Sequence, residues 1–167
     1  MTIEIGQKIP DATLSESTEF GEACPLPPTN VSVAAAVKGK RIVVFGLPGA
    51  YTPTCSAKHV PGYLESLVQL KAKKVDEVWC ISVNDGFVMA AWGQEHGAIG
   101  KIRMLGDGNA ELTKKLGLDV DLTVAGMGVR LKRFSMLLED GVVKQLNVEA
   151  PMKFEVSDAA TMLRQLA

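Results

Sequence analysis

Two short runs rich in β-branched residues constrain the fold of this 167-residue chain more than any other feature. They are RIVVFGLPG, residues 41–49, and EVWCISVND, residues 77–85. Apolar runs of this length, closed by Gly, Pro, Asn or Asp, are typical of strands buried on both faces of a parallel sheet. Residues 53–71, between the runs, carry apolar side chains near helical spacing, with a kink expected at Pro61 and Gly62. The sequence therefore predicts parallel strands joined by a helix.

In the rest of the chain, strands and helices continue to alternate until a hairpin breaks the pattern. The expected elements are a strand over residues 101–105, helices over 87–96, 109–117 and 157–166, and a hairpin that turns at Asp140-Gly141. The order βαβαβα, hairpin, helix predicts an α/β fold with a mixed central sheet, parallel first and antiparallel at its end, and helices on both faces. The segment before Arg41 is expected to form an irregular entry with short strands. No linker divides residues 1–167, so a single domain is predicted.

Composition narrows the possible functions. A net charge of −1 gives no electrostatic reason to expect nucleic acid or a membrane surface as partner. The first residues lack the pattern of a secretory signal, which predicts a cytoplasmic protein. The chain has an odd number of cysteines, Cys24, Cys55 and Cys80, which does not suggest a scaffold held by disulfides. With two histidines and no C-x-x-C pair, the sequence does not suggest a metal site.

The stretch LPGAYTPTCSAKHVPG, residues 47–62, places Cys55 where a strand gives way to a helix. Free N–H groups and the positive end of the helix dipole favour a thiolate there. Thr52 is close enough to bond the sulfur or a substrate, and Pro48 and Pro53 stiffen the loop. Because threonine stands where a second cysteine would complete C-x-x-C, a dithiol exchange site is excluded. From this stretch alone, a reactive thiol and a buried apolar cysteine remain equally supported.

PGAYTPTCS resembles the peroxiredoxin signature P-x-x-x-T-x-x-C, matched by Pro48, Thr52 and Cys55. Four further blocks extend the resemblance over nearly the full chain: KHVPGYLE, CISVNDGFVMAAWG, GVRLKRFSMLLEDG and LNVE. These blocks resemble the type II subgroup, small dimeric thiol peroxidases with a thioredoxin-like fold. The resemblance implies reduction of hydrogen peroxide and alkyl hydroperoxides through a Cys55 sulfenic acid, with glutathione and glutaredoxin, or thioredoxin, as reductant. It implies no metal or organic cofactor and a homodimer, to whose contact Tyr51 could belong.

The same resemblance assigns roles within the site. It selects Arg130, in GVRLKRF, as the arginine that stabilises the thiolate and polarises the peroxide, although Lys132 and Arg133 are equally basic. Thr52 would orient the substrate with Arg130, and Pro48 would shield the sulfur. His59, four residues after Cys55, is expected to be solvated or at an interface rather than paired with the thiol.

Cys80 is the possible resolving thiol, and geometry argues against it. It precedes the expected end of its strand at Asn84 by four residues, roughly 13 Å at ~3.3 Å per residue. A disulfide requires Cα atoms within about 7 Å, so the sequence predicts that Cys55 works without Cys80. Cys24, in the irregular entry, is expected to have no catalytic role.

Two other functions remain as alternatives. One is a thiol–disulfide oxidoreductase on the same fold, which the missing C-x-x-C disfavours. The other is a redox-regulated binding or chaperone protein whose thiol only senses oxidant. The combination of Thr52 and Arg130 favours turnover over sensing.

Overall fold

The structure is a computed structural model that describes residues 1–166, in which the main sheet is mixed and seven-stranded. In spatial order its strands are β2 (Thr29–Ser32), β1 (Thr13–Glu16), β5 (Arg103–Gly106), β4 (Glu77–Ser82), β3 (Arg41–Gly46), β8 (Phe134–Glu139) and β9 (Val142–Val148). Strands β3, β4 and β5 are parallel to one another, whereas β8 pairs antiparallel with both β3 and β9. The sheet is therefore parallel in its centre and antiparallel at both edges, and the expected α/β architecture is confirmed.

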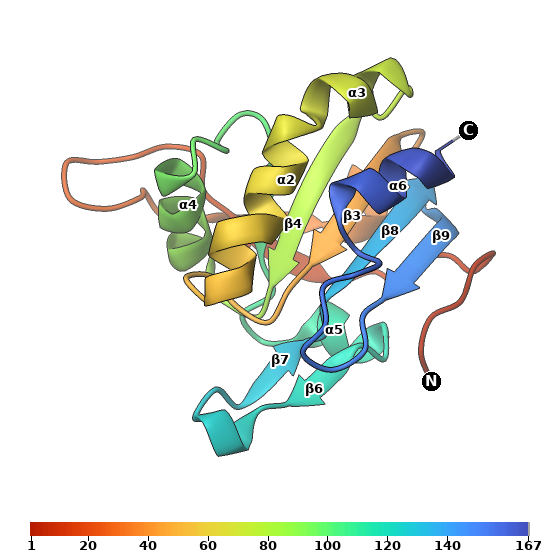
Figure 1. The fold of residues 1–167 in the computed structure, drawn as a ribbon. Coiled ribbons are helices and arrows are strands. Elements are labelled where there is room, and N and C mark those ends of the chain that lie inside the picture. The colour runs from red at the N-terminus through yellow and green to blue at the C-terminus, as the bar shows by residue number, and fades with distance from the viewer. Residues whose placement is uncertain (167) are drawn as a thin grey trace.

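Helices cover both faces of the sheet (Figure 1). One face carries α2 (Val60–Glu65), α3 (Leu67–Ala72), α4 (Gly86–Glu95) and α6 (Ala159–Gln165), and the other carries α1 (Val33–Ala36) and α5 (Glu111–Lys115). Alternate residues of β3 supply the two cores: Ile42 and Val44 point to the α1 and α5 face, and Val43 and Phe45 to the α2 face. Burial on both faces explains why this strand reads as a continuous apolar run.

The Asp140-Gly141 turn connects β8 to β9 as expected. Asp140 has φ 48° and Gly141 has φ 78°, so both turn residues lie in the left-handed region. A two-residue hairpin turn of this kind matches the twist of the flanking strands and favours Asp followed by Gly. The hairpin places β8 beside β3, where its buried residues complete the core.

The helix expected over 53–71 is irregular on either side of Pro61-Gly62 rather than kinked at that pair. Residues Cys55–His59 form a π-helix, in which the Val60 N–H donates to the carbonyl of Cys55, and α2 then runs unbroken through Pro61 and Gly62. Because Pro61 has no N–H, it cannot form the α-helical bond to Ala57, and the wider turns end just before it. The second interruption lies at Ser66, between α2 and α3.

A small second sheet was not predicted from the sequence. Strands β6 (Asp119–Asp121) and β7 (Val129–Leu131) pair antiparallel, with Val120 opposite Arg130. Each has only three residues, β6 is largely exposed and β7 buries only Leu131, so the hydrophobic pattern carries no signal for the pair. The pair lies next to the carboxyl ends of the central strands (Figure 1).

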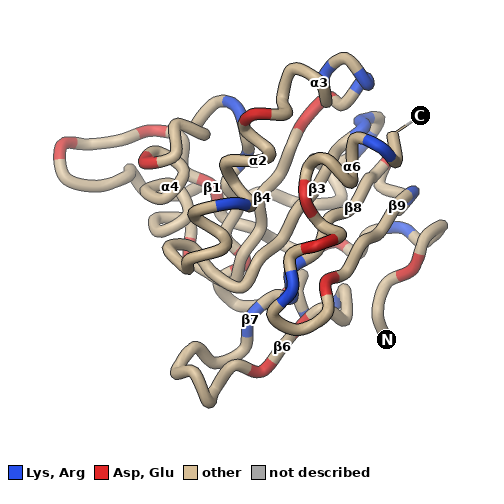
Figure 2. The backbone as a smooth tube through the Cα atoms, viewed as in Figure 1, with Lys and Arg blue, Asp and Glu red and all other residues tan. Residues whose placement is uncertain are grey.

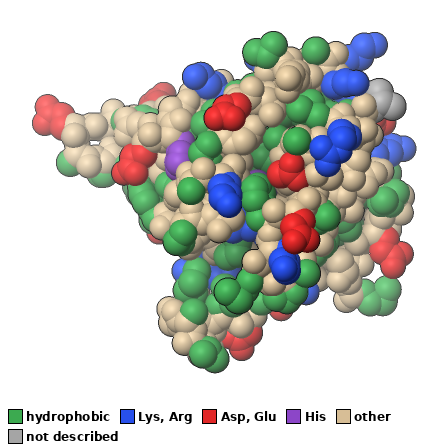
Figure 3. All heavy atoms as spheres, viewed as in Figure 1, with side chains coloured by type: hydrophobic (Ala, Val, Ile, Leu, Met, Phe, Trp, Pro, Cys, Tyr) green, Lys and Arg blue, Asp and Glu red, His purple; other side chains and the backbone are tan. Residues whose placement is uncertain are grey.

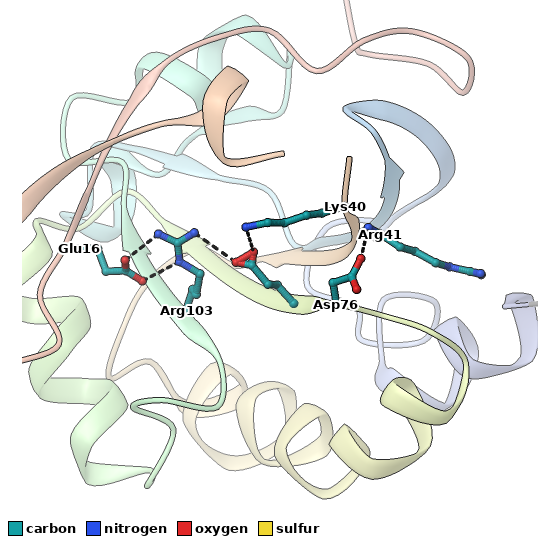
Figure 4. A network of polar contacts seen from close by, with 6 residues as sticks. Glu16, Lys40, Arg41, Asp76 and Arg103 are labelled. Atoms are coloured by element: carbon teal, nitrogen blue, oxygen red, sulfur yellow. Dashed lines mark hydrogen bonds and ion pairs between the residues drawn. The ribbon is translucent and has the colours of Figure 1, made fainter. Parts of the chain in front are cut away.

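The opposite edge of the parallel strands is held by ion pairs. Arg103 lies between Glu16, at 2.8 Å from Nη2, and Glu77, at 3.3 Å from Nη1, while Lys40 contacts Glu77 at 3.1 Å (Figure 4). The network fastens β1, β5 and β4 together where β4 and β5 begin. Elsewhere the two signs of charge are interspersed along the backbone (Figure 2). Along residues 1–166, no helix has the length and apolar character needed to cross a membrane.

Candidate active site

Cys55 lies at the carboxyl edge of the parallel strands, where β3 leads through a short loop into the π-helix. It is the first residue of that helix, and its side chain is 0% exposed. The side chain packs in the apolar core on the α2 face of the sheet. Burial by itself disfavours a charged thiolate, so the surrounding polar contacts decide whether Cys55 is reactive.

The guanidinium beside the sulfur belongs to Arg133. Its Nη2 donates to Cys55 Sγ at 3.0 Å. Arg133 lies in the two-residue segment between β7 and β8, and its carbonyl accepts a hydrogen bond from the Glu149 N–H. A charged donor at this distance stabilises thiolate over thiol and supplies a cation for an incoming peroxide.

The prediction that Arg130 is this arginine is wrong. Arg130 donates from Nη1 to the Pro48 carbonyl at 3.2 Å and from Nε to the Met127 carbonyl at 2.8 Å. Both arginines occur in RLKR, and successive side chains of an extended chain point to opposite sides, so residues 130 and 133 do not share a direction. Arg130 is paired with β6 as part of β7, whereas Arg133 follows that strand, in the segment that leads into β8.

Pro48 and Thr52 lie in the loop that precedes Cys55. Pro48 is half-buried, and its carbonyl receives the Arg130 bond. The Thr52 hydroxyl donates to the Gly49 carbonyl at 2.8 Å, which leaves the lone pairs of its oxygen free to accept. Gly49 was not singled out from the sequence, yet a Cβ there would lie 2.9 Å from Arg130 Nη1 and 3.3 Å from Thr52 Cγ2. The Pro48-Gly49 dipeptide is the sequence feature that indicates a tight turn at this position.

His59 is buried, contrary to the expectation of a solvated or interface residue. It is 1% exposed, with Nδ1 2.8 Å from Arg133 Nη1 and Nε2 3.1 Å from the Ser157 carbonyl. Because arginine only donates, Nδ1 accepts and Nε2 carries the proton. Burial, and then the positive charge of Arg133, lower the pKa of His59 to about 3. The ring is therefore neutral at physiological pH.

A buried carboxylate orders the loop that contacts His59. Glu149 accepts hydrogen bonds from the N–H groups of Glu155, Val156 and Ser157 and from the Ser157 hydroxyl. Burial alone would raise its pKa, but these donors hold the pKa of Glu149 below its ordinary value. Sequence reasoning missed Glu149, because a lone glutamate after a strand resembles any surface residue.

An apolar cavity of about 410 Å³ opens beside Arg133. Its lining residues are Pro48, Thr54, Val120, Leu122, Lys132, Arg133 and residues 148–154. In the space-filling view, hydrophobic side chains surround a hollow between the β6–β7 region and the loop after β9 (Figure 3). A ligand in the cavity would meet an apolar wall and, at the Arg133 end, a cation.

The other two thiols differ sharply in exposure. Cys24 is exposed, whereas Cys80 is 0% exposed and belongs to the same apolar core as Cys55. Burial, and then the neighbouring Cys55, raise the pKa of the Cys80 thiol. Strand β4 ends at Ser82 rather than near Asn84, so Cys80 lies two residues, or ~7 Å, from the strand end, half the distance that the sequence suggested. The three cysteines are unpaired in the described chain, and among its residues no cluster of three His, Cys, Asp or Glu side chains could hold a metal ion.

Known proteins resemble this chain over nearly its whole length. The Redoxin family model matches residues 4–163. Peroxiredoxin-2B of Arabidopsis thaliana is 46% identical over 164 residues, which cover 98% of each chain.

Two solved structures share the fold. Reduced Prx3 of Vibrio vulnificus, in complex with H₂O₂, has a TM-score of 0.90 and 46% identity, over 99% of this chain and 100% of that one. A Burkholderia cenocepacia structure, described as a putative thioredoxin reductase, has a TM-score of 0.95 and 54% identity, over 100% and 99% of the two chains.

The relatives and the geometry agree on one type of chemistry. A cysteine at a helix start, in contact with a half-buried arginine, is what a thiol that attacks peroxides requires, and the relatives named peroxiredoxin match nearly the whole chain. The chain therefore belongs to the peroxiredoxin family, resembles its type II members, and is a thiol peroxidase with a thioredoxin-like α/β fold.

Proposed function

We propose that the Cys55 thiolate attacks the terminal oxygen of a hydroperoxide. A sulfur–oxygen bond forms as the oxygen–oxygen bond breaks, which leaves a Cys55 sulfenic acid and an alkoxide, or hydroxide, that takes a proton from water. The observation that carries this assignment is the 3.0 Å contact between Arg133 Nη2 and Cys55 Sγ at the start of a helix.

Arg133 takes the role that the sequence assigned to Arg130. Its fork of donors stabilises the thiolate and the negative charge that develops on the leaving oxygen. The Thr52 oxygen accepts a hydrogen bond from the hydroperoxide O–H, whose proton stays on the oxygen transferred to sulfur, and Pro48 keeps bulk water from the sulfur. Arg130 acts on the reaction through the loop, because it holds the Pro48 carbonyl.

The substrates that we propose are hydrogen peroxide and alkyl hydroperoxides. Hydrogen peroxide needs only the polar groups around Cys55. The apolar cavity beside Arg133 supports organic hydroperoxides as well, since an alkyl group in it would be removed from water while the peroxide end meets the guanidinium.

An external thiol completes the cycle. We propose glutathione with glutaredoxin, or thioredoxin: its thiolate attacks the sulfenic sulfur, releases hydroxide, and forms a mixed disulfide that a second thiol reduces. Unpaired cysteines suit a reducing compartment such as the cytoplasm. Exposed Tyr51 and Phe87, on the loop and on α4, support a homodimer contact near the site.

Replacement of the nucleophile tests the proposed reaction. Cys55→Ser should abolish turnover in a coupled assay with an intact fold, because a serine hydroxyl supplies almost no anion near neutral pH. Cys24→Ser is the matched control and should retain turnover, since Cys24 is exposed and outside the site. Retention of even a tenth of the wild-type turnover by Cys55→Ser would overturn the assignment. Consumption of only one peroxide per Cys55 would favour a sensor, and rapid insulin reduction would favour a thiol–disulfide oxidoreductase.

A further inference from the structure

Arg133 touches Cys55 with one nitrogen and His59 with the other. We propose that His59 is a positioning residue, which holds the Arg133 guanidinium against the Cys55 sulfur through an unprotonated Nδ1. This inference rests on the proposed reaction of Cys55. It assigns a role to a buried histidine that the proposed chemistry does not otherwise use.

The two contacts fix the plane of the guanidinium. Nη2 lies 3.0 Å from Cys55 Sγ, and Nη1 lies 2.8 Å from His59 Nδ1. With only the sulfur as partner, the long arginine side chain could rotate about its last bonds and lose the alignment with substrate. A second acceptor removes that freedom before the peroxide arrives, so less ordering is needed during the reaction.

The π-helix supplies both acceptors. Cys55 and His59 are its first and last residues, and the Val60 N–H closes the turn on the Cys55 carbonyl. Residues four apart lie on the same side of a helical turn, so both side chains face the segment that carries Arg133. The Phe154 ring closes this small compartment: its centroid lies 5.0 Å from that of His59 and 5.7 Å from Arg133 Cζ.

The proton of His59 is held on the far side of the ring. Nε2 donates to the Ser157 carbonyl at 3.1 Å, and Glu149 fixes Ser157 through its N–H and hydroxyl. The charged groups around the ring are Arg133, Glu149 and Asp158. Protonation of Nδ1 would turn an acceptor into a donor that faces a guanidinium, which the low pKa of His59 prevents near neutral pH.

Two substitutions separate the two nitrogens of the ring. In His59→Asn the amide oxygen falls near Nδ1 and keeps an acceptor for Arg133. In His59→Gln the amide falls near Nε2, which keeps the Ser157 contact and removes the acceptor. We expect His59→Gln to slow the stopped-flow oxidation of Cys55 by about tenfold or more, the usual cost of a lost bond to a charged group. Its profile of Cys55 alkylation against pH should move to higher pH, whereas His59→Asn should stay near wild type in both measurements.

Tyr63→Phe is the control for a merely structural effect. The Tyr63 hydroxyl donates to the same Ser157 carbonyl at 3.0 Å, and among the described residues it forms no hydrogen bond with Arg133 or Cys55. This variant should lose stability toward denaturant and keep the wild-type rate and alkylation profile. A wild-type rate in His59→Gln, a failure of His59→Asn to retain the rate, or an equal loss of rate in Tyr63→Phe would each overturn the proposal.

A measurement on the unaltered protein covers the case in which a variant does not fold. Nitrogen–proton NMR correlation of wild type should show the His59 ring proton on Nε2 and an unprotonated, hydrogen-bonded Nδ1. A proton on Nδ1 would overturn the proposal. Absence of turnover in wild type would instead refute the proposed function, so the two failures are distinguishable.

Discussion

Arg130 and Arg133 lie three residues apart and act on different parts of the same site. Arg133 contacts the sulfur of Cys55, whereas Arg130 contacts the carbonyl of Pro48 in the loop before it. At the residue scale, the sequence placed Cys55 at the start of a helix, as the structure has it, but selected the wrong arginine as its neighbour. The position of Cys55 can be predicted from local sequence, because a strand ends and a helix begins there. Which of two nearby arginines reaches the sulfur depends instead on how distant strands pair, which the local sequence does not show.

Matched lysine substitutions distinguish the two arginines. Arg133→Lys keeps the charge but has a single nitrogen, which cannot serve both the Cys55 sulfur and His59 Nδ1. We expect the stopped-flow rate of Cys55 oxidation to fall by about tenfold or more in this variant. Arg130→Lys should cost less, because its partner is the backbone of the loop. A larger loss in Arg130→Lys than in Arg133→Lys would restore the sequence-based assignment.

At the scale of elements, those with a strong periodic pattern were predicted and those without one were not. The apolar run of β3 and the Asp140-Gly141 turn can be predicted from local sequence alone, and the structure confirms both. The π-helix and the β6–β7 pair depend on hydrogen bonds that no pattern of apolar residues encodes. The sequence predicts a kink at Pro61, but the missing N–H of that residue is accommodated by the wider turns before it.

The central position of β4 governs what Cys80 can do. The thiol is fully buried between α2 and the sheet, and burial raises its pKa, so at neutral pH it is a protonated and weak nucleophile toward a sulfenic acid. We expect peptide mapping after one equivalent of peroxide to find Cys55 as sulfenic acid, or as a glutathione adduct when glutathione is present. Cys80→Ser should retain most turnover with glutaredoxin and glutathione.

The shorter distance found for Cys80 sharpens this test. Because β4 ends at Ser82, a disulfide with Cys55 requires less rearrangement than the sequence suggested. A dominant Cys55–Cys80 crosslink within one chain would contradict the prediction, and would mean that oxidation opens the start of the helix.

At the scale of the whole molecule, the ion-pair network and the candidate active site lie at opposite edges of the same sheet. The ion pairs of Arg103 join strands at the amino edge, and the Cys55 site occupies the carboxyl edge (Figures 1 and 4). Glu149 lies on the side of the site, where its carboxylate accepts hydrogen bonds from residues 155–157 and so orders the loop that contacts His59.

The buried carboxylate of Glu149 gives the molecule a defined acid response. Because its folded pKa is lowered, it stabilises the fold above the unfolded value of about 4.3, and the contribution is lost as pH falls through the folded pKa. Glu149→Gln should lower the free energy of unfolding by about 1–3 kcal/mol at neutral pH, and the difference from wild type should shrink below about pH 4.

Denaturant titrations across pH measure this difference. Glu155→Gln is the control, because the Glu155 side chain is exposed and its pairing with Lys153 spans 3.9 Å. That variant should change stability by less than about 0.5 kcal/mol. A pH-independent difference between wild type and Glu149→Gln would contradict the charge-based explanation.

The π-helix affects how the Cys55 side chain is oriented relative to the core residues of α2. A hydrogen bond that spans five residues instead of four amounts to one extra residue inserted in an α-helix, and each residue of an α-helix turns the chain by about 100°. The additional residue fixes the angle about the helix axis between Cys55 and the core residues Val60 and Tyr63. At that angle Cys55 contacts Arg133 while Val60 and Tyr63 pack in the core. Shortening the turn by one residue would rotate the sulfur about a quarter of a circle away from its arginine and leave every α2 core contact in place.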